Sequence, residues 1–121
     1  MTSESHVDSL QELRDALRAF AAARDWDQFH SPKNLAVAVS VEAGELLEHF
    51  QWTAEARPVV LPPDSAAKVE EEMADVLLYL VRLADKLEID LLSAAKRKMA
   101  LNAERYPVSK AKGSNRKYTE L

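Results

Sequence analysis

Two pairs of acidic residues, each pair three positions apart, are the side chains of this sequence best suited to chemistry. Glu42 and Glu45 form the first pair, and Glu72 and Asp75 form the second. Residues three apart are neighbours on one face of a helix. Both pairs begin in apolar stretches, where an isolated carboxylate would sooner bind a proton than stay charged. If the two stretches are helices packed side by side, four carboxylates meet in one place.

A divalent cation explains why such a cluster would be retained. Without a counter-charge the carboxylates repel one another and some of them become protonated. Mg²⁺ binds oxygen ligands and keeps water molecules that a substrate phosphate can displace. The alternative is that each pair is an ordinary solvated helix face, because glutamate is seldom buried. A di-iron bundle is not supported, since it needs Glu-x-x-His pairs and the residue three after Glu45 is Glu48.

Composition indicates a single helical domain over residues 1–121. The chain has 121 residues, of which 47% are hydrophobic and only two are glycine, and its abundant Ala, Leu, Glu and Lys favour helix over sheet. A net charge of −4 gives no support for a nucleic-acid partner. The absence of cysteine excludes disulfides and thiolate zinc sites. With no signal-peptide core or bilayer-length apolar run, we expect a cytoplasmic protein without a membrane partner.

The apolar periodicity and the helix-start signals predict a four-helix, all-α architecture. Ser9 has capping-box spacing to Glu12, and Ser31 precedes a proline at the first helical position. Asp90 is expected to cap the last helix, and Asp64 or Ser65 the one before it. The prolines that follow Trp52 interrupt the chain between the second and third helices. The predicted helices are about 9–24, 32–52, 65–88 and 91–105, with flexible or partner-contacting tails at 1–7 and about 108–121, the second of them basic.

The second and third predicted helices are apolar around most of their circumference. Two short flanking helices cannot cover that much apolar surface in so small a chain. Another copy of the same chain could bury this apolar surface, so we expect a homo-oligomer whose interface contains these helices. A compact monomer with some exposed leucines is the alternative.

Five segments of the chain carry a resemblance to a known family. In order, they read RDWDQFHSPKNL, VEAGELLEHFQW, EEEMADVLLYLV, KRKMALNAERYP and KYTEL. This series resembles the MazG-like all-α NTP pyrophosphohydrolases, most closely their dCTP pyrophosphatase branch. The metal signature of the family, E-x-x-E followed by E-x-x-D, falls on Glu42, Glu45, Glu72 and Asp75. Many members carry a further acid at the position occupied here by Val41.

The resemblance implies hydrolysis of dCTP, or a modified dCTP, to the monophosphate and pyrophosphate, which cleanses the nucleotide pool. It implies Mg²⁺ as cofactor, with Mn²⁺ as a substitute, and a homotetramer in preference to a dimer. The metal would bind triphosphate oxygens and activate water for attack on the α-phosphorus, and Glu45 would position or deprotonate that water. The alternatives are a broader NTP pyrophosphohydrolase and a catalytically silent oligomerisation or regulatory module.

The same resemblance suggests which residues hold the nucleotide. Lys98 and Asn102, four apart on the last predicted helix, resemble contacts to phosphate and sugar. The alternative is that they belong to an ordinary solvated helix face. Arg105, Lys117 and Tyr118 are further candidates; the alternatives are a helix-end role for the arginine and an unstructured basic tail for the others. An aromatic ring stacks on a base with about 1–3 kcal/mol, but each ring could also fill the core, and His30 could support the Ser31 cap. The residues that resemble base-enclosing groups are Trp26, Phe29, His30, Trp52 and Tyr79.

Overall fold

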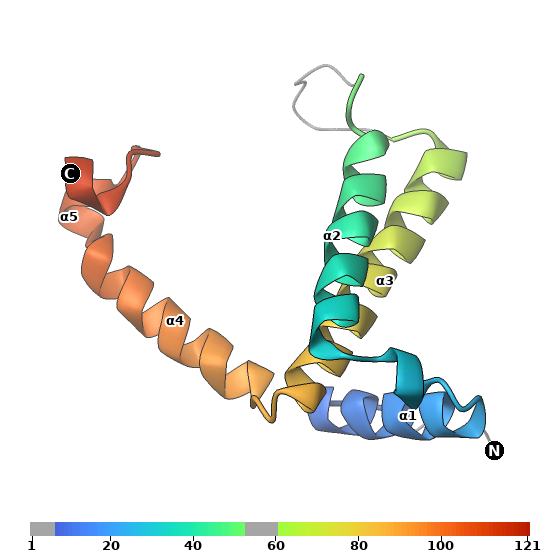
Figure 1. The fold of residues 1–121 in the computed structure, drawn as a ribbon. Coiled ribbons are helices and arrows are strands. Elements are labelled where there is room, and N and C mark those ends of the chain that lie inside the picture. Colours follow the sequence, from blue (N-terminus) through green and yellow to red (C-terminus); the bar gives the residue numbers. More distant parts are fainter. Residues whose placement is uncertain (1–6, 53–60) are drawn as a thin grey trace. The chain divides into compact units, whose positions relative to one another are not determined.

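All regular secondary structure in the described residues, 7–52 and 61–121 of the computed structural model, is helical (Figure 1). This confirms the predicted all-α class. In those residues, no helix is at once long and apolar enough to cross a membrane. The chain divides into two compact units, one ending at Glu88 and the other spanning Ile89–Leu121. The helices are α1 (Leu10–Ala23), η2 (Asp27–Phe29), α2 (Pro32–Glu48), α3 (Pro63–Lys86), α4 (Leu91–Arg105), α5 (Val108–Ala111) and η3 (Tyr118–Glu120).

Three of the predicted helix starts are confirmed by their capping hydrogen bonds. The Ser9 hydroxyl accepts from the Glu12 amide at 3.1 Å, and the Ser31 hydroxyl accepts from the Asn34 amide at 3.1 Å. The Asp90 carboxylate caps α4 in the same way. Each cap satisfies an amide that has no partner within its own helix. These short-range bonds fix where α1, α2 and α4 begin.

Two predicted boundaries are wrong. The third helix does not begin at an Asp64 or Ser65 cap: α3 starts at Pro63, and its N-cap is Pro62, which makes no side-chain cap. A proline suits the first helical turn because its fixed φ is already helical and its missing N–H needs no partner. The second helix ends at Glu48, not at residue 52, because the amides of His49 and Phe50 bond to carbonyls three residues back and close it.

In the first unit, α2 and α3 run antiparallel and side by side, and α1 lies across the end of the pair (Figure 1). The core lies where the three helices meet. Leu35 of α2 is 1% exposed and is the largest side chain that is fully buried among the described residues. The other buried apolar residues are Ala21 of α1 and Val69, Val81 and Ala84 of α3. Packing of α3 against both partners therefore fixes the register in which α2 and α3 face each other.

In the second unit, α4 is followed by α5 and η3, which return the chain toward the end of α4. The Arg105 guanidinium lies over the Tyr118 ring, 4.6 Å from its centroid. Tyr106 meets the same ring edge-on, with centroids 6.0 Å apart. The region predicted as a basic tail thus contains two short helical turns; whether it contacts a partner or a substrate stays a prediction. The predictions for residues 1–6 and 53–60 lie outside the described residues.

Candidate metal and nucleotide site

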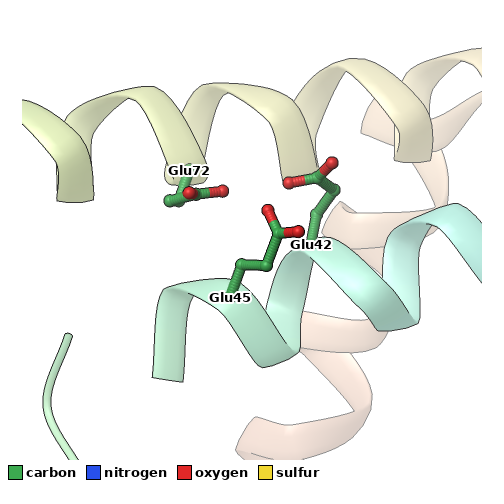
Figure 2. Close-up of side chains that lie close together, drawn as sticks. All are labelled: Glu42, Glu45 and Glu72. Atoms are coloured by element: carbon green, nitrogen blue, oxygen red, sulfur yellow. The ribbon is translucent and has the colours of Figure 1, made fainter. Parts of the chain in front are cut away.

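Three of the four predicted acids converge between α2 and α3 (Figure 2). Glu42 and Glu45 project from α2, and Glu72 projects from the facing part of α3. One carboxylate oxygen of each residue lies within 4.8 Å of the others. Oxygens at such separations can share one hard cation, which binds carboxylates at about 2.0–2.6 Å. The helices α2 and α3 are therefore packed side by side, as a shared carboxylate site requires.

Asp75, the fourth predicted ligand, is not in this close group. It lies three residues beyond Glu72, on the next turn of the same helix. Its charge nevertheless contributes to the raised pKa of the Glu42 carboxyl, so it lies within electrostatic range. Three acids form the close group, with Asp75 next to it.

The electrostatics of the group are those of a cation-binding site. The pKa of Glu42 is raised to about 7, first by burial, then by hydrogen bonding to Glu72 and Glu45 and by the charges of Glu45 and Asp75. Among the described residues, Oε2 of Glu42 and Oε2 of Glu72 are buried with no hydrogen-bond partner. Buried polar atoms normally have a partner, and a lone one needs an explanation. A bound divalent cation would satisfy both oxygens and remove the repulsion.

His49 also lies at this site. Its Nε2 is 3.9 Å from Oε1 of Glu72. It follows Glu45 by four positions, not by the three of a Glu-x-x-His motif. Residues four apart also share a helix face, so that spacing was a signal that could have placed His49 beside the acids.

The predicted base-enclosing residues of the first unit lie in three places: before α2, after the end of α2, and on α3. Trp26 meets Phe20 edge-on, with ring centroids 5.7 Å apart, and Trp26 and Phe29 both keep exposed ring surface. Trp52, which follows the end of α2, is 88% exposed, too open to be core filler. Tyr79 is partly buried on α3, one turn beyond Asp75. Nucleotide contact by these residues stays a prediction.

His30 is engaged with α3. Its Nδ1 accepts a hydrogen bond from Nε of Arg82 at 3.2 Å. The alternative that His30 supports the Ser31 cap is not seen, because that hydroxyl is bound by the Asn34 amide, while the Asn34 side chain bonds to the Phe29 carbonyl. Sequence reasoning missed Arg82 completely.

The remaining candidates belong to the second unit. Lys98 and Asn102 are exposed and four apart on α4. Arg105 and Tyr118 contact each other, which fits the structural alternative for the arginine. Lys117 is the N-cap residue of η3. For all of these residues, contact with a substrate stays a prediction.

An all-α chain with acids facing one another across two antiparallel helices has the features of the MazG-like proteins. The MazG-like family model matches residues 37–121, which include all four acids. The chain belongs to the MazG-like family, and the resemblance seen in the sequence is confirmed.

The chain is also similar to individual proteins named as pyrophosphatases. It is 46% identical over 115 residues to dCTP pyrophosphatase 1 of Mus musculus, covering 93% of this chain and 68% of that protein. It is 45% identical over 121 residues to the Bos taurus protein of the same name, covering 98% and 72%. A crystal structure of a pyrophosphatase from Archaeoglobus fulgidus superposes with a TM-score of 0.68 at 44% identity, over 84% of this chain and 95% of that one.

Proposed function

We propose that this chain hydrolyses a deoxynucleoside triphosphate, dCTP or a modified dCTP, to the monophosphate and pyrophosphate with the help of Mg²⁺. The observation that carries the proposal is the convergence of Glu42, Glu45 and Glu72 with two buried carboxylate oxygens left unpartnered. Such a group is costly in a protein that uses it only for packing. The relatives named dCTP pyrophosphatase 1 support the choice of substrate.

In the proposed reaction, some of the acids would bind the cofactor and another would accept a proton. Glu42 and Glu72, each with an unpartnered buried oxygen, would hold the cofactor, and Asp75 would add negative charge beside them. When bound, Mg²⁺ or Mn²⁺ supplies positive charge to the triphosphate oxygens and makes a water molecule more acidic. Glu45 orients the attacking water and accepts its proton. The exposed rings of Trp26 and Trp52 offer stacking surfaces for the base.

A panel of nucleotides tests the proposal. Each canonical dNTP and NTP is incubated with the chain and Mg²⁺, and the products are separated to distinguish pyrophosphate from orthophosphate. We expect pyrophosphate and the monophosphate, with dCTP hydrolysed fastest. Equal rates for all bases would leave a broader NTP pyrophosphohydrolase. No release from any triphosphate would leave a non-catalytic oligomerisation or regulatory module.

A matched pair of variants ties the activity to the site. Glu45→Gln keeps the size of the side chain but cannot accept a proton, so pyrophosphate release should fall by about 100-fold or more. Glu48→Gln makes the same change one turn further along α2, outside the close group, and should keep the wild-type rate. Similar rates for the two variants would remove Glu45 from the reaction.

A further inference from the structure

A second cluster of charged side chains lies in the first unit, built around Arg82. Arg82 is 6% exposed and is the one charged residue that is buried among the described residues. A guanidinium removed from water is tolerated only when its N–H groups are hydrogen-bonded and its charge is paired. Its partners therefore show what it holds in place. We call Arg18, Asp27, His30, Arg82, Asp85 and Lys86 the Arg82 cluster.

Three donors of Arg82 reach three different side chains. Nε donates to Nδ1 of His30 at 3.2 Å, one terminal nitrogen donates to Asp85 at 3.1 Å, and the other donates to Asp27. Asp85 lies one turn along α3, whereas Asp27 and His30 belong to the segment that joins α1 to α2. The planar guanidinium presents these donors in a fixed fork. One side chain thus fastens residues 26–30, with the predicted base contacts Trp26 and His30, to α3.

Other charges of the cluster hold Arg82 in this geometry. Arg18 of α1 binds both oxygens of Asp85, through Nε and a terminal nitrogen. Lys86 is the second donor to Asp27. Each carboxylate that Arg82 binds is therefore shared with another cation, and the guanidinium has little freedom to turn.

The contact with His30 determines where the imidazole carries its proton. The Nε of arginine is always a donor, so Nδ1 of His30 must be the acceptor and the proton of the neutral ring lies on Nε2. Burial lowers the pKa of His30, and the charge of Arg82 lowers it further. Lys86 acts in the same direction, and only Asp27 opposes it.

We propose that Arg82 is a positioning residue that holds His30 as the neutral Nε2–H tautomer, so that His30 offers a bound nucleotide one hydrogen-bond donor. This inference rests on the proposed function for the nucleotide, while the tautomer does not depend on it. A fixed donor matches an acceptor atom of the base, such as O2 or N3 of cytosine. It does not match the N3–H of thymine.

The nitrogen shifts of His30 in the ¹⁵N-labelled full-length chain test the tautomer directly. At neutral pH we expect the proton on Nε2 and a bare Nδ1, and we expect the Nε2 signal to shift when a non-hydrolysable dCTP analogue is added. A ring protonated on Nδ1, or charged at neutral pH, would overturn the proposal. A His30 nitrogen signal that does not shift when the dCTP analogue is added would also overturn the proposal.

Three variants separate positioning from general stability. Arg82→Met keeps an apolar stem but removes the donors, so the tautomer preference should be lost and KM for dCTP should rise about 10-fold, with a smaller change in kcat. Arg82→Lys, which restores a cation without the fork, should recover only part of this. Lys68→Met removes a cation at an exposed position of α3 outside the Arg82 cluster, so it should keep the Nε2–H tautomer and the wild-type KM.

The outcomes distinguish this inference from the proposed function. A wild-type tautomer and KM in Arg82→Met would overturn the positioning role of Arg82. An Nε2–H ring that responds to the nucleotide, in a chain that hydrolyses no triphosphate, would contradict the proposed function alone. If Arg82→Met does not fold, Asp27→Asn provides the test: it weakens the hold on Arg82 at a side chain that is largely exposed, and the same His30 shifts and KM are measured.

Discussion

Glu42 is the carboxyl whose ionisation is most disfavoured among the described residues. Burial and the neighbouring acids raise its pKa to about 7, and one of its oxygens has no hydrogen-bond partner. A carboxyl in this state can lose its proton and bind a metal ion in its place. Its chemistry therefore predicts both how the site binds metal and how the metal-free chain responds to pH.

Removing one carboxylate charge should abolish the metal site without unfolding the helices. We expect Glu42→Gln and Asp75→Asn each to lower pyrophosphate release by about 100-fold or more and to weaken Mg²⁺ binding in calorimetry, because each removes negative charge that faces the cation. The helical circular-dichroism signal should stay at the wild-type level. The control is Glu70→Gln, an exposed acid of α3 outside the group; if it lost as much binding, the binding would not depend on this site.

The pH dependence of stability has a definite sign. The pKa of Glu42 is higher in the folded chain, about 7 against the ordinary glutamate value of 4.5, so between these values the folded state binds more protons than the unfolded state. Its stabilising contribution is complete below the unfolded pKa and is lost as the pH rises through the folded one.

We therefore expect the Tm of the metal-free chain, measured in EDTA, to fall from about pH 5.5 to about pH 8 more steeply than the Tm of Glu42→Gln. At the higher pH the variant should be the more stable protein, since it carries no buried charge there. Parallel curves for the two proteins would show that Glu42 titrates normally.

At the scale of single residues, the sequence was enough to find the acids but not their neighbours. Glu42, Glu45 and Glu72 were recognisable from short spacings and apolar surroundings. The spacing of His49 from Glu45 indicates a shared helix face, but its contact with Glu72, like that of His30 with Arg82, joins residues far apart in the sequence. No local pattern encodes such a pair, since it depends on how two helices are placed side by side.

At the scale of the helices, the buried face of α2 fixes where the acids stand. Leu35 is fully buried two turns before Glu42. We expect Leu35→Ala to lower the free energy of unfolding by about 2–5 kcal/mol through the cavity that it leaves. Leu47→Ala makes the same substitution at an exposed position of α2 and should cost less than about 1 kcal/mol. Urea denaturation of both variants checks this, and equal losses would contradict the observed face of α2.

Helix starts were predictable where a side chain caps them, as at Ser9, Ser31 and Asp90. The start of α3 was not, because prolines in a loop predict an interruption of the chain as readily as the first turn of a helix. The end of α2 has no glycine or proline to mark it, and backbone bonds three residues back close it instead. A helix boundary set by a side-chain cap could be predicted from the sequence, whereas one set by backbone hydrogen bonds alone could not.

At the scale of the whole molecule, α2 and α3 leave apolar side chains uncovered. Val37 and Val41 on α2, and Met73, Leu77 and Leu80 on α3, are exposed at helical spacing. Apolar residues that recur on one face of each helix are typical of an interface between subunits. The predicted homo-oligomer, a tetramer in preference to a dimer, is therefore a proposal with a defined surface.

We expect light scattering to give the wild-type chain a mass of several subunits, and Leu77→Lys to lower that mass, because a buried lysine has no partner in an apolar interface. Glu71→Lys places the same residue at an exposed, acidic position of α3 and should keep the wild-type mass. A wild-type chain that is monomeric at every concentration would refute the interface.

The central claim is that α2 and α3 together provide the carboxylates that hold a divalent cation against a triphosphate. Crystals soaked with Mn²⁺ and a non-hydrolysable dCTP analogue test it most directly, because the anomalous signal of Mn²⁺ locates the ion. We expect an anomalous peak among the carboxylate oxygens of Glu42, Glu45, Glu72 and Asp75, with the triphosphate beside it. A triphosphate bound elsewhere, with no ion among these carboxylates, would contradict the claim.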